Sequence, residues 1–257
     1  MFDTTEKKIC ETCGEPQFVE LEGRVFRVNC RCLTEKYEKE EQERQKQLKL
    51  KLFKQLQVNA SMGEEYLKAR FETAIVNEHN KGVYEKAKNY CKNYIQVYKE
   101  NHGLYIYGDN SSGKTHLSAC IANDLMEKDI QVIFTSLGSI IRETFRNDLI
   151  YERLARVPFL FLDDLGKEFI GRENDAQKAK YAETVLKNVL DARVNNNKPL
   201  IITSNYSMEK LATELKLDRA ILERLNVAIS REWELTGTNF RDLKLEQKIK
   251  KADRLGI

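Results

Sequence analysis

Residues 108–115 read GDNSSGKT and match the phosphate-binding pattern G-x-x-x-x-G-K-[ST]. GLYIY before them has the composition of a short buried strand, and HLSACIANDLMEK after them is typical of an amphipathic helix. Backbone N–H groups of a loop between strand and helix, together with the positive end of the helix dipole, bind phosphate groups. We therefore predict a site for a nucleoside triphosphate; the weaker alternative is a plain Gly/Ser turn before a helix.

Two side chains of this loop have specific expected roles. Lys114 is expected to reach the β and γ phosphates, and the hydroxyl of Thr115 is expected to ligate Mg²⁺. The other residues expected to cradle the phosphates are Gly108, Asp109, Asn110, Ser111, Ser112 and Gly113.

Polar residues also follow two apolar runs further along the chain. FLFL is followed by Asp163 and Asp164, and LIITS is followed by Asn205. At the carboxyl end of a parallel strand, Asp163 is expected to face the Mg²⁺, while Asp164 orients the attacking water. Asn205 can hydrogen-bond the γ-phosphate or that water. Each motif alone fits an ordinary turn, but behind a phosphate-binding loop they indicate nucleotide hydrolysis.

Four cysteines fall within the first 32 residues, at Cys10, Cys13, Cys30 and Cys32. A C-x₂-C pair and a C-x-C pair, with sixteen residues between them, are typical of one tetrahedral Zn²⁺ site. Four protein ligands leave no open coordination position, so this zinc is expected to be structural. The alternative is four free thiols in an unstructured leader, but FVELEGRVFRV between the pairs alternates like a hairpin.

The elements that must position these residues can be read from the apolar pattern. TEKYEKEEQERQKQLKLKLFKQLQ (34–57) predicts a solvent-exposed charged helix acting as a spacer, with a partner-binding helix as the alternative. VYEKAKNYCKNYIQVYKEN (83–101) predicts one helix leading into the first strand, and Cys91 and Cys120 fit helical core positions. From residue 103 onward, strands that are apolar throughout alternate with helices. This favours an α/β fold with an open, doubly wound parallel sheet.

Composition narrows the class of protein. The chain has 257 residues, is 41% hydrophobic and 32% charged, and contains no apolar run of the roughly 18 residues that a membrane span requires. No signal-peptide pattern opens the sequence, so we expect a cytoplasmic protein that does not cross a membrane. The net charge of +3 is too small to indicate nucleic-acid binding by itself.

With these motifs in place, the chain resembles an AAA+ ATPase of the DnaC/DnaI helicase-loader group, and is similar to IstB-type transposition ATPases. The resemblance covers roughly residues 100–243. The stretches that carry it are YGDNSSGKTHLSACIAND, RETFRN, FLFLDDLGKE, YAETVLKNVLDAR, KPLIITSN and LDRAILERL. The N-terminal cysteine cluster resembles the zinc-binding region of some loaders and phage homologues.

The resemblance implies roles for further residues. Asn205 corresponds to the sensor-1 residue, and Arg224 corresponds to the arginine finger that completes a neighbouring subunit's site. Arg219 is the alternative finger, and the weaker alternative for either arginine is a surface helix residue paired with Glu223 or Asp218. Arg241 resembles a sensor-2 arginine, and no C-terminal helical lid is expected. Many related ATPases carry Glu where this chain has Asp164.

The segment SIIRETFRN predicts a DNA-binding element. Arg142, Phe145 and Arg146 on one helix supply two cations and one aromatic ring, a combination that holds single strands without reading sequence. By pattern alone Phe145 fits a core position better. The family resemblance, in which this element lines a path for single-stranded DNA, favours the DNA-binding role.

We therefore expect an ATP-dependent loader of a DnaB-type hexameric helicase onto single-stranded DNA, assembling with itself through the ATP site and using ATP, Mg²⁺ and Zn²⁺. The expected parts are a zinc-binding module (1–35), a charged helical linker (36–70), an AAA+ ATPase domain (71–243) and a polar tail (244–257). A transposition helper ATPase would share the ATPase motifs but needs no zinc module. A non-hydrolysing, ATP-bound adaptor is the other alternative, and its only indication is the Asp at position 164.

Overall fold

The computed structural model describes residues 9–59, 62–146, 149–171 and 173–236, together with 240, 249 and 253–254. The chain divides into two compact units, 1–54 and 55–257, and each is described by itself.

The N-terminal unit contains a hairpin and the start of a long helix. Strands β1 (Phe18–Leu21) and β2 (Arg24–Arg27) pair antiparallel, with Leu21 opposite Arg24 at the turn. This pairing confirms the hairpin expected between the two cysteine pairs. Helix α1 (Arg31–Asn59) then includes the predicted charged helix and begins a turn earlier, at the second cysteine pair.

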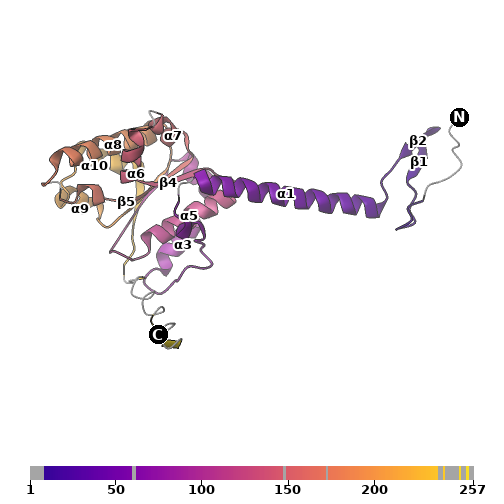
Figure 1. Ribbon diagram of the computed structural model, residues 1–257, viewed down its shortest axis with the longest axis horizontal. Coiled ribbons are helices and arrows are strands. Elements are labelled where there is room, and N and C mark those ends of the chain that lie inside the picture. The colour runs from indigo at the N-terminus through magenta and orange to yellow at the C-terminus, as the bar shows by residue number, and fades with distance from the viewer. Residues whose placement is uncertain are drawn as a thin grey trace. The chain divides into compact units, whose positions relative to one another are not determined.

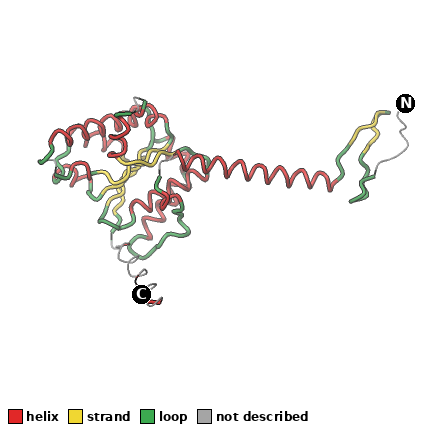
Figure 2. The backbone as a smooth tube through the Cα atoms, in the orientation of Figure 1, coloured by secondary structure: helices red, strands yellow, loops and turns green. Residues whose placement is uncertain are grey.

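The second unit is built on a five-stranded sheet in the order β4-β5-β6-β3-β7, in which every pairing is parallel (Figures 1 and 2). The strands are β3 (Gly103–Tyr107), β4 (Val132–Ser136), β5 (Phe159–Leu165), β6 (Leu200–Ser204) and β7 (Ile229–Glu234). Because consecutive side chains of a strand point to opposite faces, the uniformly apolar β5 and β6 require a cover on both.

Helices supply that cover in two layers. Figure 1 shows α5 and α3 on one side of the sheet and α6, α8 and α10 on the other. Leu160 and Leu162 of β5 join the core shared with α6 to α10, so the equally buried Phe161 between them points to the α5 side. The expected doubly wound α/β fold is confirmed.

On the α5 side lie α2 (Glu64–Leu67), α3 (Lys81–Lys92), α4 (Tyr94–Lys99) and α5 (Lys114–Glu127). The single helix expected over 83–101 is wrong in one respect, because α3 and α4 are separate helices with Asn93 between them. Asn93 ends α3 and donates its side-chain amide to the carbonyl of Asn89. Such local bonding competes with helix continuation. Cys91 and Cys120 are buried, as expected.

On the other side lie α6 (Leu137–Thr144), α7 (Ile150–Arg156), the 3₁₀ turn η1 (Lys167–Phe169), α8 (Ala176–Asn195), α9 (Met208–Thr213) and α10 (Arg219–Ala228). None of the described helices is both long and apolar enough to cross a membrane.

A fully buried arginine joins this layer to the sheet. The guanidinium of Arg193, in the last turn of α8, donates to the carbonyls of Leu154, Val157, Pro158 and Pro199 at 2.6–3.0 Å. These carbonyls lie at the end of α7 and at the starts of β5 and β6. Burial lowers the pKa of Arg193 to about 9. One side chain therefore donates hydrogen bonds to four backbone carbonyls, whose burial without a donor would lower the stability of the fold.

Candidate functional site

The phosphate-binding loop is shaped by two glycines that no other residue could replace without strain. Gly108 has φ 151° and Gly113 has φ 94°. A Cβ atom on Gly108 would lie 2.0 Å from the carbonyl oxygen of Leu235, and one on Gly113 would lie 2.8 Å from the ring of Phe240. The spacing of glycines in the motif therefore has a direct steric cause in this chain.

Lys114, the first residue of α5, turns its ammonium back into this loop. Its Nζ donates to the carbonyls of Gly108 (2.9 Å) and Asp109 (2.6 Å) and contacts Ser112 Oγ at 3.4 Å. Burial lowers the pKa of Lys114, while the carboxylates of Asp164 and Asp109 oppose that shift. The loop thus holds a buried cation by neutral oxygen acceptors, which the charged oxygens of a phosphate can replace with stronger bonds.

The carboxylate of Asp163, near the end of β5, faces the first turn of α5. Its Oδ2 accepts from the hydroxyl of Thr115 at 3.3 Å and its Oδ1 from the hydroxyl of Thr203 at 2.6 Å. Burial raises the pKa of Asp163, and the two hydroxyl donors oppose that shift. A carboxylate and a hydroxyl at this distance are the hard oxygen ligands that Mg²⁺ prefers beside phosphate oxygens. The residues present therefore fit a Mg²⁺ site.

Thr203 of β6 was not expected from the sequence. Besides donating to Asp163, its hydroxyl accepts the backbone N–H of Asp164 at 2.8 Å. One buried side chain therefore positions both acids. The strand run LIITSN contains it, but only the parallel pairing of β5 with β6 shows that Thr203 lies opposite the two acids.

Asp164 lies with its backbone in the left-handed region, at φ 60°. Its carboxylate forms an ion pair with Lys167, three residues later. Asp164 and Asn205 line one cavity of about 660 Å³ together with Lys114 and Thr115. The structure thus brings together the acid, the amide and the phosphate-binding lysine that the sequence predicted. Their roles in hydrolysis stay predictions.

The same cavity is also lined by aromatic and aliphatic side chains that lie outside the phosphate loop. Its lining includes Tyr66 and Ile75 from the segment before α3, Tyr84 of α3, and His116 of α5. The hydroxyl of Tyr84 lies 3.3 Å from His116 Nδ1. Aromatic and aliphatic side chains beside a phosphate loop suit the flat face of a nucleobase. Sequence reasoning missed this region because its residues belong to no motif.

The segment after β7 contacts the phosphate loop. The backbone N–H of Phe240 donates to the carbonyl of Ser111 at 3.0 Å, and its ring lies against Gly113. Phe240 also lines the cavity, together with Asn110 and Ser111. Arg241, the expected sensor-2 residue, lies outside the described residues.

The two candidate finger arginines differ in their contacts. Arg224 of α10 forms an ion pair with Asp191 of α8 and donates to the carbonyl of Ala220 at 3.1 Å. Arg219 is more exposed and pairs with Glu223 at 3.0 Å. Neither lines the nucleotide cavity of its own chain. The role of Arg224 toward a second subunit stays a prediction.

The predicted DNA-binding residues lie at the end of α6. Arg142 is in its last turn and donates to Ser139 Oγ at 2.9 Å. The helix ends at Thr144, so Phe145 and Arg146 lie just beyond it, not on its faces as expected. Phe145 is 74% exposed, which shows that the core interpretation of this residue is wrong.

A carboxylate connects this helix to the acid strand. Glu168 of η1 accepts the backbone N–H of Gly138, in the first turn of α6, at 2.9 Å. Burial raises the pKa of Glu168. Glu168 lies four residues after Asp164 in the chain. Its hydrogen bond to Gly138 therefore holds the start of α6 against the segment that follows β5.

The four N-terminal cysteines gather in the first unit, where all four sulfurs lie within 4.8 Å of one another. Cys10 Sγ lies 3.4 Å from Cys32 Sγ, which lies 3.3 Å from Cys30 Sγ. Zinc–sulfur bonds of about 2.3 Å need sulfurs roughly 3.8 Å apart, so the cluster fits one tetrahedral ion after a small adjustment. Backbone N–H groups of Cys13 and Thr12 lower the pKa of the Cys10 thiol to about 6, whereas hydrogen bonds with Cys30 and Cys10 raise the pKa of the Cys32 thiol.

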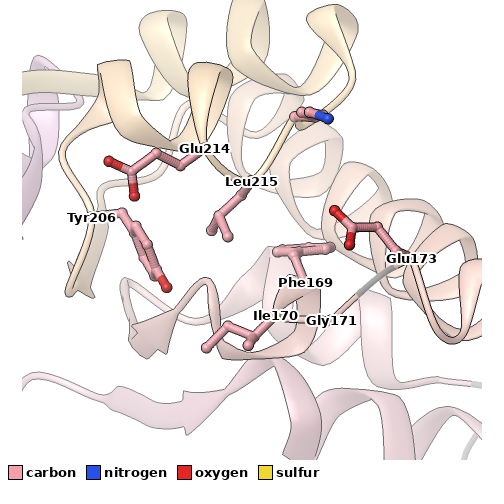
Figure 3. Close-up of a pocket in the computed structure, with 8 residues that line it drawn as sticks. Phe169, Ile170, Gly171, Glu173, Tyr206, Glu214 and Leu215 are labelled. Carbon is pink, nitrogen blue, oxygen red and sulfur yellow. The ribbon is translucent and has the colours of Figure 1, made fainter.

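A second cavity of about 420 Å³ lies beside η1, the 3₁₀ turn that comes after the acid strand. Tyr206, Leu215 and Phe169 surround it, and Glu173 and Glu214 belong to its lining (Figure 3). Tyr206 directly follows Asn205, but the lining contains none of the predicted nucleotide-binding residues.

The matched region of the chain has known relatives. A family model described as Novel STAND NTPase 3 matches residues 86–238, more than half of the chain. The chain belongs to this family. A member of an NTPase family is expected to bind a nucleotide through a phosphate loop and acid strand like those described above.

Two curated relatives and one solved structure give a finer comparison. Replicative helicase loader DnaI of Bacillus subtilis (strain 168) is 27% identical over 155 residues, covering 58% of this chain and 47% of DnaI. Replicative helicase loader DnaC of Escherichia coli (strain K12) is 24% identical over 149 residues, covering 54% of this chain and 57% of DnaC. The chain therefore spans about half the length of these relatives. A crystal structure of DnaI matches with a TM-score of 0.54 at 26% identity, covering 70% of this chain and 94% of that structure. The resemblance to the helicase-loader group and its AAA+ fold is confirmed.

Proposed function

We propose that this chain is an ATP-dependent loader of a DnaB-type hexameric helicase onto single-stranded DNA. The observation that carries the proposal is the assembled nucleotide site. Lys114, Thr115, Asp163 and Thr203 converge at one sheet edge, in a chain whose relatives are named replicative helicase loaders.

Hydrolysis at this site would use the chain's own residues as follows. Lys114 would bind the phosphates, and Thr115 and Asp163 would hold Mg²⁺, which would neutralise charge on the phosphate oxygens. Asp164 and Asn205, which line the same cavity, would orient the attacking water. Arg224 of a second subunit completes the site, which makes hydrolysis depend on assembly.

The two other proposed contacts, one with the helicase and one with single-stranded DNA, are made by different units of the chain. The zinc module would bind the helicase, because a small cysteine-stapled unit offers a rigid surface separate from the ATPase core. The exposed Phe145, with Arg142 and Arg146, would hold the single strand. The division at residues 35, 70 and 243 is part of this proposal.

A binding assay with the full chain tests the proposal. The chain is mixed with a DnaB-type hexameric helicase, with ATP and with ADP, and the mixture is run on a sizing column. We expect co-elution with the helicase, and transfer of the helicase to a closed single-stranded DNA circle only in the presence of ATP. Failure to co-elute with any hexameric replicative helicase of its host would overturn it.

One observation favours a second candidate, a non-hydrolysing adaptor that keeps ATP as a structural ligand. The carboxylate of Asp164 is already engaged in an ion pair with Lys167, so in this arrangement it is not free to orient a water molecule. Turnover of ATP by the assembled chain on single-stranded DNA decides between the two candidates.

A further inference from the structure

A second lysine, Lys167 of η1, lines the nucleotide cavity together with Lys114, Thr115 and Asn205. Burial is the main cause that lowers the pKa of Lys114, and the charge of Lys167 lowers it further. Burial raises the pKa of Asp163, and the same charge opposes that shift. The charge of Lys167 therefore acts at the place where the terminal phosphate of a nucleotide is expected.

The turn that carries Lys167 has a fixed backbone. Asp164 and Gly166 both have left-handed φ values, of 60° and 117°. A Cβ atom on Gly166 would lie 2.9 Å from the ring of Tyr206, so glycine is required at this position. The backbone N–H of Asp164 donates to Thr203 Oγ1 at 2.8 Å. The turn brings Lys167 to the carboxylate of Asp164, three residues earlier, with which it forms an ion pair.

The side chain of Lys167, in contrast to its backbone, is weakly held. It is 61% exposed, against 28% for the side chain of Asp164, which is its ion-pair partner among the described residues. An ion pair with one partner this exposed contributes little to stability. Lysine also carries its charge on a flexible four-carbon stem. The ammonium of Lys167 can therefore leave Asp164 at low cost when a stronger anion is within reach.

We propose that Lys167 changes partners when ATP binds, leaving the carboxylate of Asp164 for an oxygen of the γ-phosphate. Hydrogen bonds between a lysine and a phosphate are strong because both groups are charged. ADP ends one phosphate earlier and leaves the ion pair in place. The carboxylate of Asp164 is then free to orient water only while ATP occupies the site. This rests on the proposed ATP hydrolysis and adds to it a residue that distinguishes ATP from ADP.

The test measures the affinity of the full chain for ADP and for an ATP analogue that is not hydrolysed, each by displacement of a fluorescent nucleotide. Lys167→Met keeps the length of the side chain and removes its charge, so it should weaken binding of the analogue about tenfold and leave ADP affinity within about twofold. The neutral variant Lys167→Gln should show the same selective loss, whereas Lys167→Arg keeps a cation and should retain most of the preference for the analogue. The matched control is Lys210→Met. It alters an exposed lysine of α9 that pairs with Glu214 at 3.7 Å outside the lining of the nucleotide cavity, and should change neither affinity.

The outcomes separate this inference from the proposed function. Wild-type chain that binds neither nucleotide would refute the nucleotide site itself, and the inference with it. Normal wild-type binding with an unchanged ratio of the two affinities in Lys167→Met would refute only the exchange of partners. If Lys167→Met also hydrolysed ATP faster at that unchanged ratio, the lysine would stay on Asp164 when ATP is bound, as the non-hydrolysing adaptor requires. An equal loss of both affinities would make Lys167 a general phosphate-binding cation and refute the exchange too.

Discussion

Individual side chains at the nucleotide site carry separable tasks. Lys114 contacts the phosphate loop itself, whereas Asp164 faces the cavity from β5. In the proposed mechanism Lys114 would contact the phosphates of bound ATP, and Asp164 would be needed only when water attacks. The two residues should therefore fail in different ways when replaced.

For this reason Lys114→Ala should abolish ATP binding, and Asp164→Asn should bind ATP with nearly wild-type affinity but hydrolyse it at least 100-fold more slowly. Equilibrium binding of a fluorescent ATP analogue and steady-state phosphate release measure the two effects. Equal ATP affinity in the wild-type and Lys114→Ala proteins would be incompatible with the assigned site.

Thr203 provides a prediction that depends on pH. Its hydroxyl lowers the pKa of Asp163 against the raising effect of burial, so Thr203→Val should raise that pKa further. Mg²⁺ needs the ionised carboxylate, so the acid limb of the rate profile should move to higher pH, and half-maximal activity should need about tenfold more Mg²⁺. The control Thr203→Ser keeps the hydroxyl and should behave like wild type. An acid limb that does not move in Thr203→Val would contradict the assignment.

Among the secondary-structure elements, α8 holds its layer to the sheet through Arg193. Arg193→Leu keeps much of the apolar bulk but leaves four buried carbonyls without their donor. The free energy of unfolding should fall by about 3 kcal/mol or more. Urea unfolding followed by circular dichroism measures it, and the exposed Lys187→Leu on the same helix should change stability by less than about 0.5 kcal/mol. A similar small loss in both variants would show that the carbonyls find other donors.

The secondary-structure elements also show which features of the fold and the site could be predicted from the sequence. The phosphate loop, the acid strand and the parallel order were predictable because glycine spacing and uniformly apolar strands have local causes. Thr203 and Arg193 were not predictable, because their partners are brought to them by strand pairing and helix packing between segments distant in the chain. Phe145 was ambiguous because an apolar residue at a helix end is buried or exposed according to where the helix stops, and α6 stops one residue earlier.

For the assembled molecule, the proposed role of Arg224 predicts that ATP hydrolysis depends on contact between two subunits. Arg224→Ala should bind ATP normally and hydrolyse it slowly, and mixing it with Lys114→Ala should restore part of the activity. In the mixed assembly, Arg224 of the Lys114→Ala chain meets an intact phosphate loop. Arg219→Ala, which alters the alternative finger, is the comparison: it should keep wild-type activity if Arg224 is the finger, and loss of activity in Arg219→Ala instead would assign the role to Arg219. Without any recovery on mixing, the arginine would act only within its own chain, where it pairs with Asp191.

The cysteine cluster of the N-terminal unit leads to a separate prediction about the zinc content of the chain. Purified chain should carry one Zn²⁺, and replacing Cys10 and Cys13 by serine should remove it, together with helicase binding, while ATP binding persists because the ATPase core is separate. Elemental analysis measures the metal. Cys91→Ala, which alters a buried cysteine of α3, should retain the full zinc content. Zinc-free wild-type protein prepared without chelator would exclude the metal site.

The left-handed backbone at Asp164 limits which acid can occupy that position. A side chain in this region costs roughly 1–2 kcal/mol, except that Asn and Asp reach it more readily because their short polar groups bond locally. Glutamate would supply an equivalent carboxylate one methylene further out, but on a backbone that disfavours it. The length of the candidate base is therefore decided by the main chain at the end of β5, and lengthening it by design would require first rebuilding the turn through Gly166, just before η1.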